Sequence, residues 1–494
     1  MDILVFLSSG LFLGWSLGAN DAANVFGTAV GSRMVKFRTA AFLCSFFIVL
    51  GATISGSGAA HTLGQLGAVN ALAGAFTVAL AAALATFWMT RLKLPVSTSQ
   101  AVVGAIIGWN LYASALTDTG SLTRIVLTWI ACPLLSAFNA VILMLLLRWA
   151  IRRAKPHLLE LDALTRYGLL IVGAFGSYSL GANNIANVMG IFLPENPFHD
   201  VHFWGLTFNA TQQLFLLGSL AIGVGVVTYS QRVMRTVGGG LVRMSPVAAL
   251  VVVLAHSITL FLFASARLEH WLASHGLPTF PLVPVSSSQA VIGAIIGIGL
   301  LRGGRGIRYN ILGSISLGWL ATPLVAGVMS FLLLFFVENV FDQEVYRTIR
   351  FRIDRQVVEE VERLHLPSEG LAALAGRDMS NPVRFRRRLS SATGLPENQL
   401  DLITELARLA SIRVDPGVLA LAGGRDWLTP GQWQALETLD GNSYTRSWAF
   451  HRDLGEASPE WRPLPDSKVN RYWNQDLRRK LEYLDRIFQT QPEE

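Results

Sequence analysis

The chain has 494 residues, of which 52% are hydrophobic and only 15% are charged, and its mean hydropathy is +0.44. Soluble domains carry about 25% charged residues, so this composition excludes an ordinary soluble protein and predicts an all-α polytopic membrane protein. The formal net charge of +7 does not indicate a nucleic-acid partner, because Arg and Lys residues gather in the loops that flank the apolar runs.

Ten apolar runs have roughly the length of a membrane-spanning helix, which needs about 20 residues. They lie at 3–30, 39–58, 69–90, 96–115, 123–148, 165–192, 203–228, 246–266, 285–301 and 310–338. Basic residues concentrate in the odd-numbered loops, and positive-inside reasoning places these loops in the cytoplasm and the N-terminus outside. The sequence therefore predicts a multi-pass protein of the cell (plasma) membrane.

The odd number of runs in each half implies that the second half enters the membrane from the opposite face. We therefore predict two inverted-topology repeats with broken or half-length helices, an architecture typical of secondary transporters. Residues 1–150 form the first repeat, 151–164 a basic cytoplasmic linker, and 165–340 the second repeat. Residues 341–494 are richer in charge and are predicted to form a soluble, mostly helical domain of unknown role.

This C-terminal domain is predicted to begin with a helix from Phe341 to Leu364, because apolar residues recur there at helical spacing. Further amphipathic helices are expected around Leu402 and Leu477. We interpret Arg386–Arg388 as a solvated basic face, with a lipid or regulatory contact as the alternative.

A polar motif interrupts the first apolar run at Ser16–Gly27, and it recurs as Ser179–Gly190 with nine of twelve residues identical. The main change is that Asn184 replaces Asp21. An ionisable residue at membrane depth costs about 2.5–3.5 kcal/mol, so Asp21 requires a compensating partner. We interpret the two motifs as ion-coordinating breaks in two symmetry-related helices.

The polar residues of these motifs suit a small cation. Asp21 and Asn24 are spaced to share one helix face, and so are Asn184 and Asn187. Their oxygens are hard ligands suited to Na⁺, and unwound backbone carbonyls beside them would complete the shell. The four residues are the candidate cation site, with Asp21 and Asn24 as the candidate Na⁺ ligands. A purely structural role for Asp21 is the alternative.

A second motif, Pro95–Gly108, recurs as Pro284–Gly297 with twelve of fourteen residues identical. Pro followed by hydroxyl residues is typical of a helix start. A helix that begins within the membrane points free N–H groups at its surroundings, so two such starts would surround a tetrahedral oxyanion with donors. The candidate substrate ligands are Ser97, Thr98, Ser99, Gln100, Ser286, Ser287, Ser288 and Gln289. The alternative is that these hydroxyls only join helices, as Ser and Thr commonly do in membranes.

A third landmark, Trp129–Pro133, recurs as Trp319–Pro323, and the matched order of all three motifs indicates an internal duplication. Within the second motif, the Gly-x-x-x-Gly spacing of Gly104 and Gly108 predicts that helices approach closely there.

The charge balance of the membrane region favours symport. No Lys or Arg lies deep in an apolar run, so a bound anion has to be offset by helix dipoles and by a co-transported cation. His256 lies in an apolar run, and we interpret it as a packing residue rather than a proton relay.

The first motif, read on to Ser32, closely resembles the signature of the inorganic phosphate transporter (PiT) family, and Pro95–Gly108 resembles its second motif. The likeness covers roughly residues 1–340. It implies a cation-coupled importer of inorganic phosphate, commonly driven by Na⁺ or H⁺ and often dimeric, with no cofactor. It also implies that the hydroxyl-rich half-helices hold the anion and that Asp21 and Asn24 hold the cation.

Three departures from the family pattern bear on the substrate. The family usually has Asp where this chain has Asn184, and His where this chain has Gln100 and Gln289. These changes remove titratable groups, so the coupling ion stays open between Na⁺ and H⁺. A sulfate-permease branch of the family also departs at the His position, and a sulfate permease is therefore the alternative function. Asp21 can accept a proton from protonated phosphate but not from sulfate, which favours phosphate.

Two other function classes fit the sequence less well. An aspartyl protease needs two carboxylates that share a proton, but the counterpart of Asp21 is Asn184, so no enzyme is predicted. Inverted repeats with broken helices favour alternating access over a passive channel. The expected partners are inorganic phosphate or sulfate, Na⁺ or H⁺ and the lipid bilayer, with a homodimer left open.

Overall fold

A computed structural model describes residues 2–67, 69–91, 96–196, 198, 201–203, 206–234, 245–304, 309–421, 428–465 and 470–490. The chain divides into two compact units. Residues 1–113, 117–198 and 208–347 form the first unit, and residues 114–116, 199–207 and 348–494 form the second.

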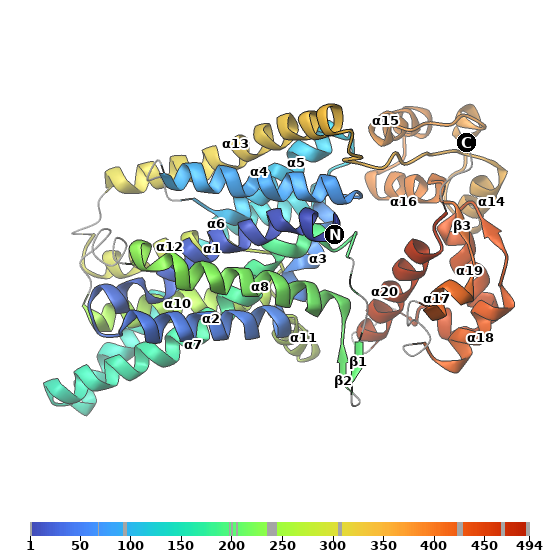
Figure 1. Cartoon of the computed structure of the whole chain (residues 1–494). Coiled ribbons are helices and arrows are strands. Elements are labelled where there is room, and N and C mark those ends of the chain that lie inside the picture. Colours follow the sequence, from blue (N-terminus) through green and yellow to red (C-terminus); the bar gives the residue numbers. More distant parts are fainter. Residues whose placement is uncertain are drawn as a thin grey trace. The chain divides into compact units, whose positions relative to one another are not determined.

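The first unit consists of helices, and the long ones among them run side by side (Figure 1). They are α1 (Asp2–Gly31), α2 (Phe37–Ser55), α3 (Ser57–Leu66), α4 (Leu72–Arg91), α5 (Thr98–Tyr112), α6 (Thr119–Ala154), α7 (Leu158–Met189), α8 (Ala210–Thr228), α10 (Pro246–Ala264), α11 (Ala266–Ser274), α12 (Ser287–Leu301) and α13 (Tyr309–Phe341). A 3₁₀ turn, η1 (Gly190–Phe192), follows α7. The short strands β1 (Val201–Phe203) and β2 (Leu206–Phe208), which pair with one another ahead of α8, belong to the second unit except for Phe208.

Within the described ranges, six helices are long and apolar enough to cross a membrane, namely α2, α4, α6, α8, α10 and α13. Helices α5 and α12 have only 15 residues each. A helix of that length is too short to span a hydrocarbon layer of about 30 Å, which needs about 20 residues. The prediction of an all-α polytopic membrane protein that contains half-length helices is therefore confirmed.

The duplicated sequence folds into duplicated contacts between the two halves. A methyl group added at Gly104 on α5 would collide with the carbonyl oxygen of Pro323 on α13, and one at Gly293 on α12 would collide with that of Pro133 on α6. The predicted close packing at these glycines is therefore present. Because glycine lacks a side chain, each half-length helix can touch the backbone of the opposite half. The inverted orientation of the halves in the membrane stays a prediction.

The predicted break in the two motif helices is wrong. Helix α1 runs without interruption through Ser16–Gly27, and α7 continues to Met189. The glycines serve close packing instead, because a methyl group at Gly18 would collide with the backbone of Ile222 on α8. Carbonyl groups inside a continuous helix are bonded along the helix, so they are not offered to a cation in the way that we expected.

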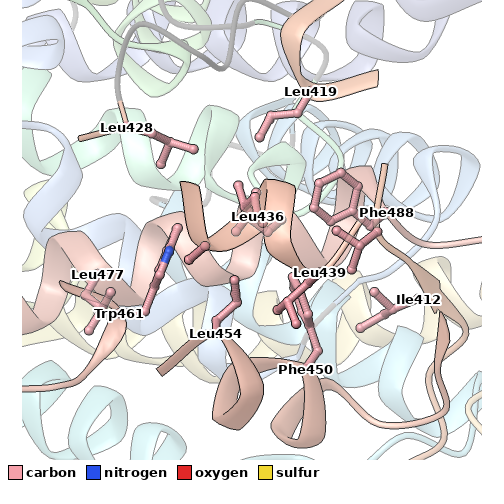
Figure 2. Packing of buried hydrophobic residues seen from close by; sticks show 13 residues of the cluster. Ile412, Leu419, Leu428, Leu436, Leu439, Phe450, Leu454, Trp461, Leu477 and Phe488 are labelled. Atoms are coloured by element: carbon pink, nitrogen blue, oxygen red, sulfur yellow. The ribbon is translucent and has the colours of Figure 1, made fainter. Parts of the chain in front are cut away.

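The second unit contains short helices around two hydrophobic cores. The first core includes Phe351, Ile353, Phe385 and Leu389, and the second is built around Trp461, as Figure 2 shows. Its elements are α14 (Arg355–Arg363), η2 (Leu371–Leu374), α15 (Pro382–Thr393), α16 (Glu397–Ala407), β3 (Ile412–Arg413), α17 (Pro416–Leu421), α18 (Pro430–Thr438), β4 (Ser443–Tyr444), α19 (Ser447–Ala457), η4 (Pro459–Trp461) and α20 (Arg471–Ile487). Helices α16 and α20 include the amphipathic residues that the sequence singled out.

The predicted helix from Phe341 to Leu364 is wrong over its first half. Helix α13 ends at Phe341, and α14 begins only at Arg355. Between them the backbone of Phe351 forms β-bridges instead of helical turns. The carboxylate of Asp354 accepts a hydrogen bond from the Val357 backbone (3.1 Å), which starts α14 where the apolar spacing alone gave no boundary.

Candidate functional site

The two half-length helices start in the same way. Ser97 precedes α5 with an extended backbone, and its hydroxyl accepts a hydrogen bond from the Gln100 backbone N–H at 3.3 Å. Ser286 precedes α12, and its hydroxyl accepts from the Gln289 backbone N–H at the same distance, 3.3 Å. All four residues are buried. Each helix therefore begins inside the protein, capped by the serine that the duplicated motif supplies.

A reciprocal pair of hydrogen bonds joins the two helix starts. The Ser99 hydroxyl of α5 donates to the carbonyl oxygen of Val285 at 3.2 Å. The Ser288 hydroxyl of α12 donates to the carbonyl oxygen of Val96 at 3.1 Å. Ser99 and Ser288 occupy equivalent positions in the two motifs, and so do Val96 and Val285. The structure thus brings the two hydroxyl segments together, one from each half of the chain.

The asparagines of the first motif reach these helix starts from α1 and α7. Asn24 donates its side-chain N–H to the Ser287 hydroxyl at 2.8 Å, and Asn187 donates to the Ser99 hydroxyl, also at 2.8 Å. Each asparagine therefore bonds a half-length helix that lies in the opposite half of the sequence. The four predicted cation residues and the hydroxyl segments consequently form one polar site.

Asp21 has the compensating partner that its position requires. Its carboxylate accepts a hydrogen bond at 3.2 Å from the side chain of Asn184 on α7. Asn184 is the residue that replaces it in the second copy of the motif. Asn184 is buried, whereas Asp21 is only partly buried. Among the residues that the structure describes, the site thus has a single carboxylate, which lies at the contact between α1 and α7.

Asn183 holds the chain ahead of α12 in place, a role that the sequence did not reveal. Its side chain donates to the Val285 carbonyl at 2.7 Å and accepts from the Val285 N–H at 2.9 Å. The same side chain donates to Asn184 at 2.7 Å and is fully buried. The only available signal was its place beside Asn184 in a repeated motif, because the partner lies far away in the sequence.

His256, which we interpreted from the sequence as a packing residue, is fully buried and also contacts the polar site. The Nε2 atom of its ring lies 3.1 Å from the Ser287 hydroxyl. The other ring nitrogen, Nδ1, is buried and has no hydrogen-bond partner among the residues described. An unpaired buried N–H is rarer than an unpaired acceptor in backbone groups. If the same preference holds for the imidazole ring, the unpaired Nδ1 carries no proton. The ring proton is then on Nε2, which donates it in a hydrogen bond to the Ser287 hydroxyl.

The hydroxyl groups differ in whether their hydrogens are free. The hydroxyl hydrogens of Ser99 and Ser288 are already used in hydrogen bonds, because the partners of these hydroxyls are carbonyl oxygens, which can only accept. The Ser286 hydroxyl lies 3.0 Å from the Ser288 hydroxyl, whose hydrogen is already donated to Val96, so Ser286 must be the donor to Ser288. Ser97 and Thr98 have no acceptor for their hydroxyl hydrogens among the described residues. Ser287 joins these two when His256 donates to it, since its two lone pairs are then filled and its hydrogen is free.

The site also contains acceptors without partners. The side-chain oxygens of Gln100, Gln289 and Asn187 are buried and unpaired among the residues that the structure describes. An unsatisfied buried polar group costs about 1–3 kcal/mol. Such oxygens could bind a cation or accept a hydrogen bond from an O–H group of a ligand. The site therefore offers free donors and free acceptors to a small, polar ligand.

Comparisons with known proteins agree on one type of protein. A family model described as the phosphate transporter family matches residues 17–164, 153–269 and 273–384. A protein of Methanocaldococcus jannaschii named "Putative phosphate permease" is 27% identical over 323 residues, which are 65% of this chain and 93% of that protein. The "Probable low-affinity inorganic phosphate transporter" of Rhizobium meliloti is 25% identical over 341 residues, 67% of this chain and 94% of that protein.

The fold is also similar to that of a solved structure. The protein named "The sodium-dependent phosphate transporter" superimposes with a TM-score of 0.55 at 22% identity, over 69% of this chain and 100% of that one. At this identity the likeness concerns the fold alone.

Proposed function

Because this chain belongs to the phosphate transporter family, we propose that it carries inorganic phosphate across the cell membrane together with Na⁺, by alternating access. The family consists of transporters and not of enzymes, in agreement with the sequence-based prediction. The extracytoplasmic N-terminus and the homodimer stay predictions.

The observation that carries the proposal is the reciprocal pairing of Ser99 with Val285 and of Ser288 with Val96. It holds the N-termini of α5 and α12 together inside the protein. Each N-terminus presents free backbone N–H groups and a partial charge of about +0.5, which favours an anion. A phosphate between the two starts would meet positive potential from both halves without any Lys or Arg.

The free donors and acceptors favour phosphate over sulfate. We assign the hydroxyls of Ser97, Thr98 and Ser287 to the phosphate oxygens, because these are the hydroxyls whose hydrogens are available. The unpaired oxygens of Gln100 and Gln289 can accept a hydrogen bond from a protonated oxygen of the ligand. Phosphate still carries at least one proton at neutral pH, whereas sulfate carries none and would leave both oxygens unsatisfied.

The cation is assigned to Asp21, Asn24, Asn184 and Asn187, whose side-chain oxygens are hard ligands. Among the described residues of the site, Asp21 supplies the only formal negative charge, and the oxygen of Asn187, unpaired among these residues, is available to a cation. A carboxylate next to a bound phosphate would be repulsive unless a cation lies between them. Na⁺ is preferred to H⁺ because the solved structure with the same fold is named as sodium-dependent.

The test is uptake of radiolabelled phosphate by proteoliposomes that contain the full chain. We expect accumulation above equilibrium with an inward Na⁺ gradient, and little uptake when K⁺ replaces Na⁺. A proton gradient without Na⁺ that drives equal accumulation would overturn the choice of coupling ion. Unlabelled sulfate should compete poorly, and competition by sulfate at lower concentrations than unlabelled phosphate would make the protein a sulfate permease.

A further inference from the structure

An apolar groove lies where the two halves of the chain join. Its volume is about 370 Å³, and α6, α7 and α10 form its walls. The apolar side chains that line it include Leu147, Ile151, Leu161, Leu164, Val247 and Leu250. Leu164 is more than half exposed, so the groove opens to the outside of the helix bundle. In a membrane, that opening faces lipid.

Basic residues surround one end of this groove. Arg152, Arg153 and Lys155 lie at the C-terminal end of α6, and all three are exposed. Lys155 is itself part of the groove wall, which also contains one acidic residue, Glu160. Arg148 and Arg166 add two further positive charges on α6 and α7. In the described part of the chain, none of the five forms an ion pair with an acidic side chain.

The helix dipole explains only part of this arrangement. Arg and Lys in the last turn of a helix are favourable for the dipole of α6. This accounts for Arg152 and Arg153 but not for Arg166, which lies in the third turn of α7. It also does not account for an open apolar groove beside the charges. A ligand with a negative head and an apolar tail would satisfy both features at once.

We propose that this groove binds one acyl chain of an anionic phospholipid, whose phosphate contacts Lys155, Arg152 and Arg153. Basic pockets between membrane helices are suited to anionic head groups, and positive-inside reasoning places this one on the cytoplasmic side. Free inorganic phosphate would use the charges but leave the apolar walls exposed. Trp149, which is exposed and lies under the Arg153 guanidinium at 5.7 Å, marks the level of the membrane interface.

Such a lipid would also link the two halves of the protein. The groove wall combines the last helix of the first half, the first helix of the second half and α10. Helix α10 carries His256, which contacts Ser287 in the polar site. The proposal itself does not depend on the transported substrate, so it can be tested without a transport assay.

The first test measures lipid retained by the purified full chain. The protein is exchanged into mixed micelles that contain equal amounts of phosphatidylglycerol and phosphatidylcholine, and bound lipid is counted by native mass spectrometry. We expect at least a fivefold preference for phosphatidylglycerol. Equal retention of the two lipids by the unmodified protein would overturn the proposal, whatever the behaviour of any variant.

The second test uses variants matched in charge. Replacing Arg152, Arg153 and Lys155 by Gln should remove the preference. Replacing Arg33, Lys36 and Arg38 by Gln removes the same charge from the loop between α1 and α2 and from the first turn of α2, and it should leave the preference intact. An equal effect of the two triple substitutions would show that only overall charge matters and would overturn the site.

A third variant fills the groove while leaving every charge in place. Leu161→Trp should reduce bound phosphatidylglycerol severalfold, because the indole would occupy the space assigned to the acyl chain. Unchanged binding in this variant would show that the groove holds no chain, and the proposal would then fail. Elution of each variant at the volume of the unmodified protein in size-exclusion chromatography checks that it is folded.

Discussion

Asp21 on α1 and Asn184 on α7 are equivalent positions of a duplicated motif, and their side chains are hydrogen-bonded to one another at 3.2 Å. The single carboxylate of the site therefore contacts the amide that stands in its place in the second copy. This contact lies beside the two helix starts, since Asn187, one turn after Asn184, bonds to Ser99.

Removing the charge of Asp21 should abolish coupling. We expect Asp21→Asn to reduce Na⁺-driven phosphate accumulation in proteoliposomes at least tenfold, because the cation then loses its only charged ligand in the site. The amide retains the shape of the side chain, so the protein should remain folded. Asp162→Asn, on the exposed start of α7, serves as a control that should transport normally. Normal uptake by Asp21→Asn would remove this residue from the mechanism.

Removing the hydroxyl of Thr98 should weaken phosphate binding, whereas removing that of its neighbour Ser99 should lower the stability of the fold. Thr98→Ala removes a hydroxyl that has no acceptor in the described structure, so we expect the KM for phosphate to rise about tenfold, as for a lost hydrogen bond to a charged group. Its melting temperature should change little. Ser99→Ala removes two hydrogen bonds, the one donated to the Val285 carbonyl and the one accepted from Asn187, and should lower stability by about 1–3 kcal/mol. Thermal unfolding in detergent and uptake kinetics, measured on both variants, would reveal the opposite pattern if the assignment is wrong.

His256 should act through Ser287. His256→Leu removes the donor to the Ser287 hydroxyl, which can then turn its hydrogen away from the ligand, so the KM for phosphate should rise severalfold. His256→Gln keeps a side-chain N–H that can reach Ser287, and it should recover part of the loss. A purely structural role predicts instead that both variants lose protein stability without a specific change in KM.

The close approaches of the half-length helices should be sensitive to a single methyl group. Gly104→Ala and Gly293→Ala each place a Cβ against a proline carbonyl oxygen. Overpacking of this kind typically costs about 1–3 kcal/mol, and both variants should melt at lower temperatures. Gly313→Ala on α13, where nothing lies within 4 Å of the added Cβ, is the matched control. Equal melting temperatures for all three variants would contradict the packing described here.

Much of the fold could be predicted because its signals are local. Apolar runs indicate the long helices, and Ser97 and Ser286 mark the starts of α5 and α12 through their capping bonds. The juxtaposition of these starts followed from the duplication. The continuity of α1 was missed because glycine in a polar motif was interpreted as a break, although in a membrane it also permits a neighbouring backbone to approach.

The remaining parts of the site depend on contacts between distant segments. Asn183 could be given a role only once Val285 lay beside it. His256 stands in an ordinary apolar helix, and nothing in its local sequence indicates Ser287 as its neighbour. The hydrogen bonds that Ser99 and Ser288 donate likewise follow from the contact between the two segments that precede α5 and α12.

The inequality of Asp21 and Asn184 has an energetic consequence for a duplicated carrier. If two identical halves were related by a two-fold axis in the membrane plane, the outward-open and inward-open forms would be equivalent by symmetry and equal in free energy. A negative charge that is present on α1 and absent from α7 makes the free energies of the two forms unequal. In such an arrangement this side chain would contribute to the resting orientation of the empty carrier and to its response to membrane voltage.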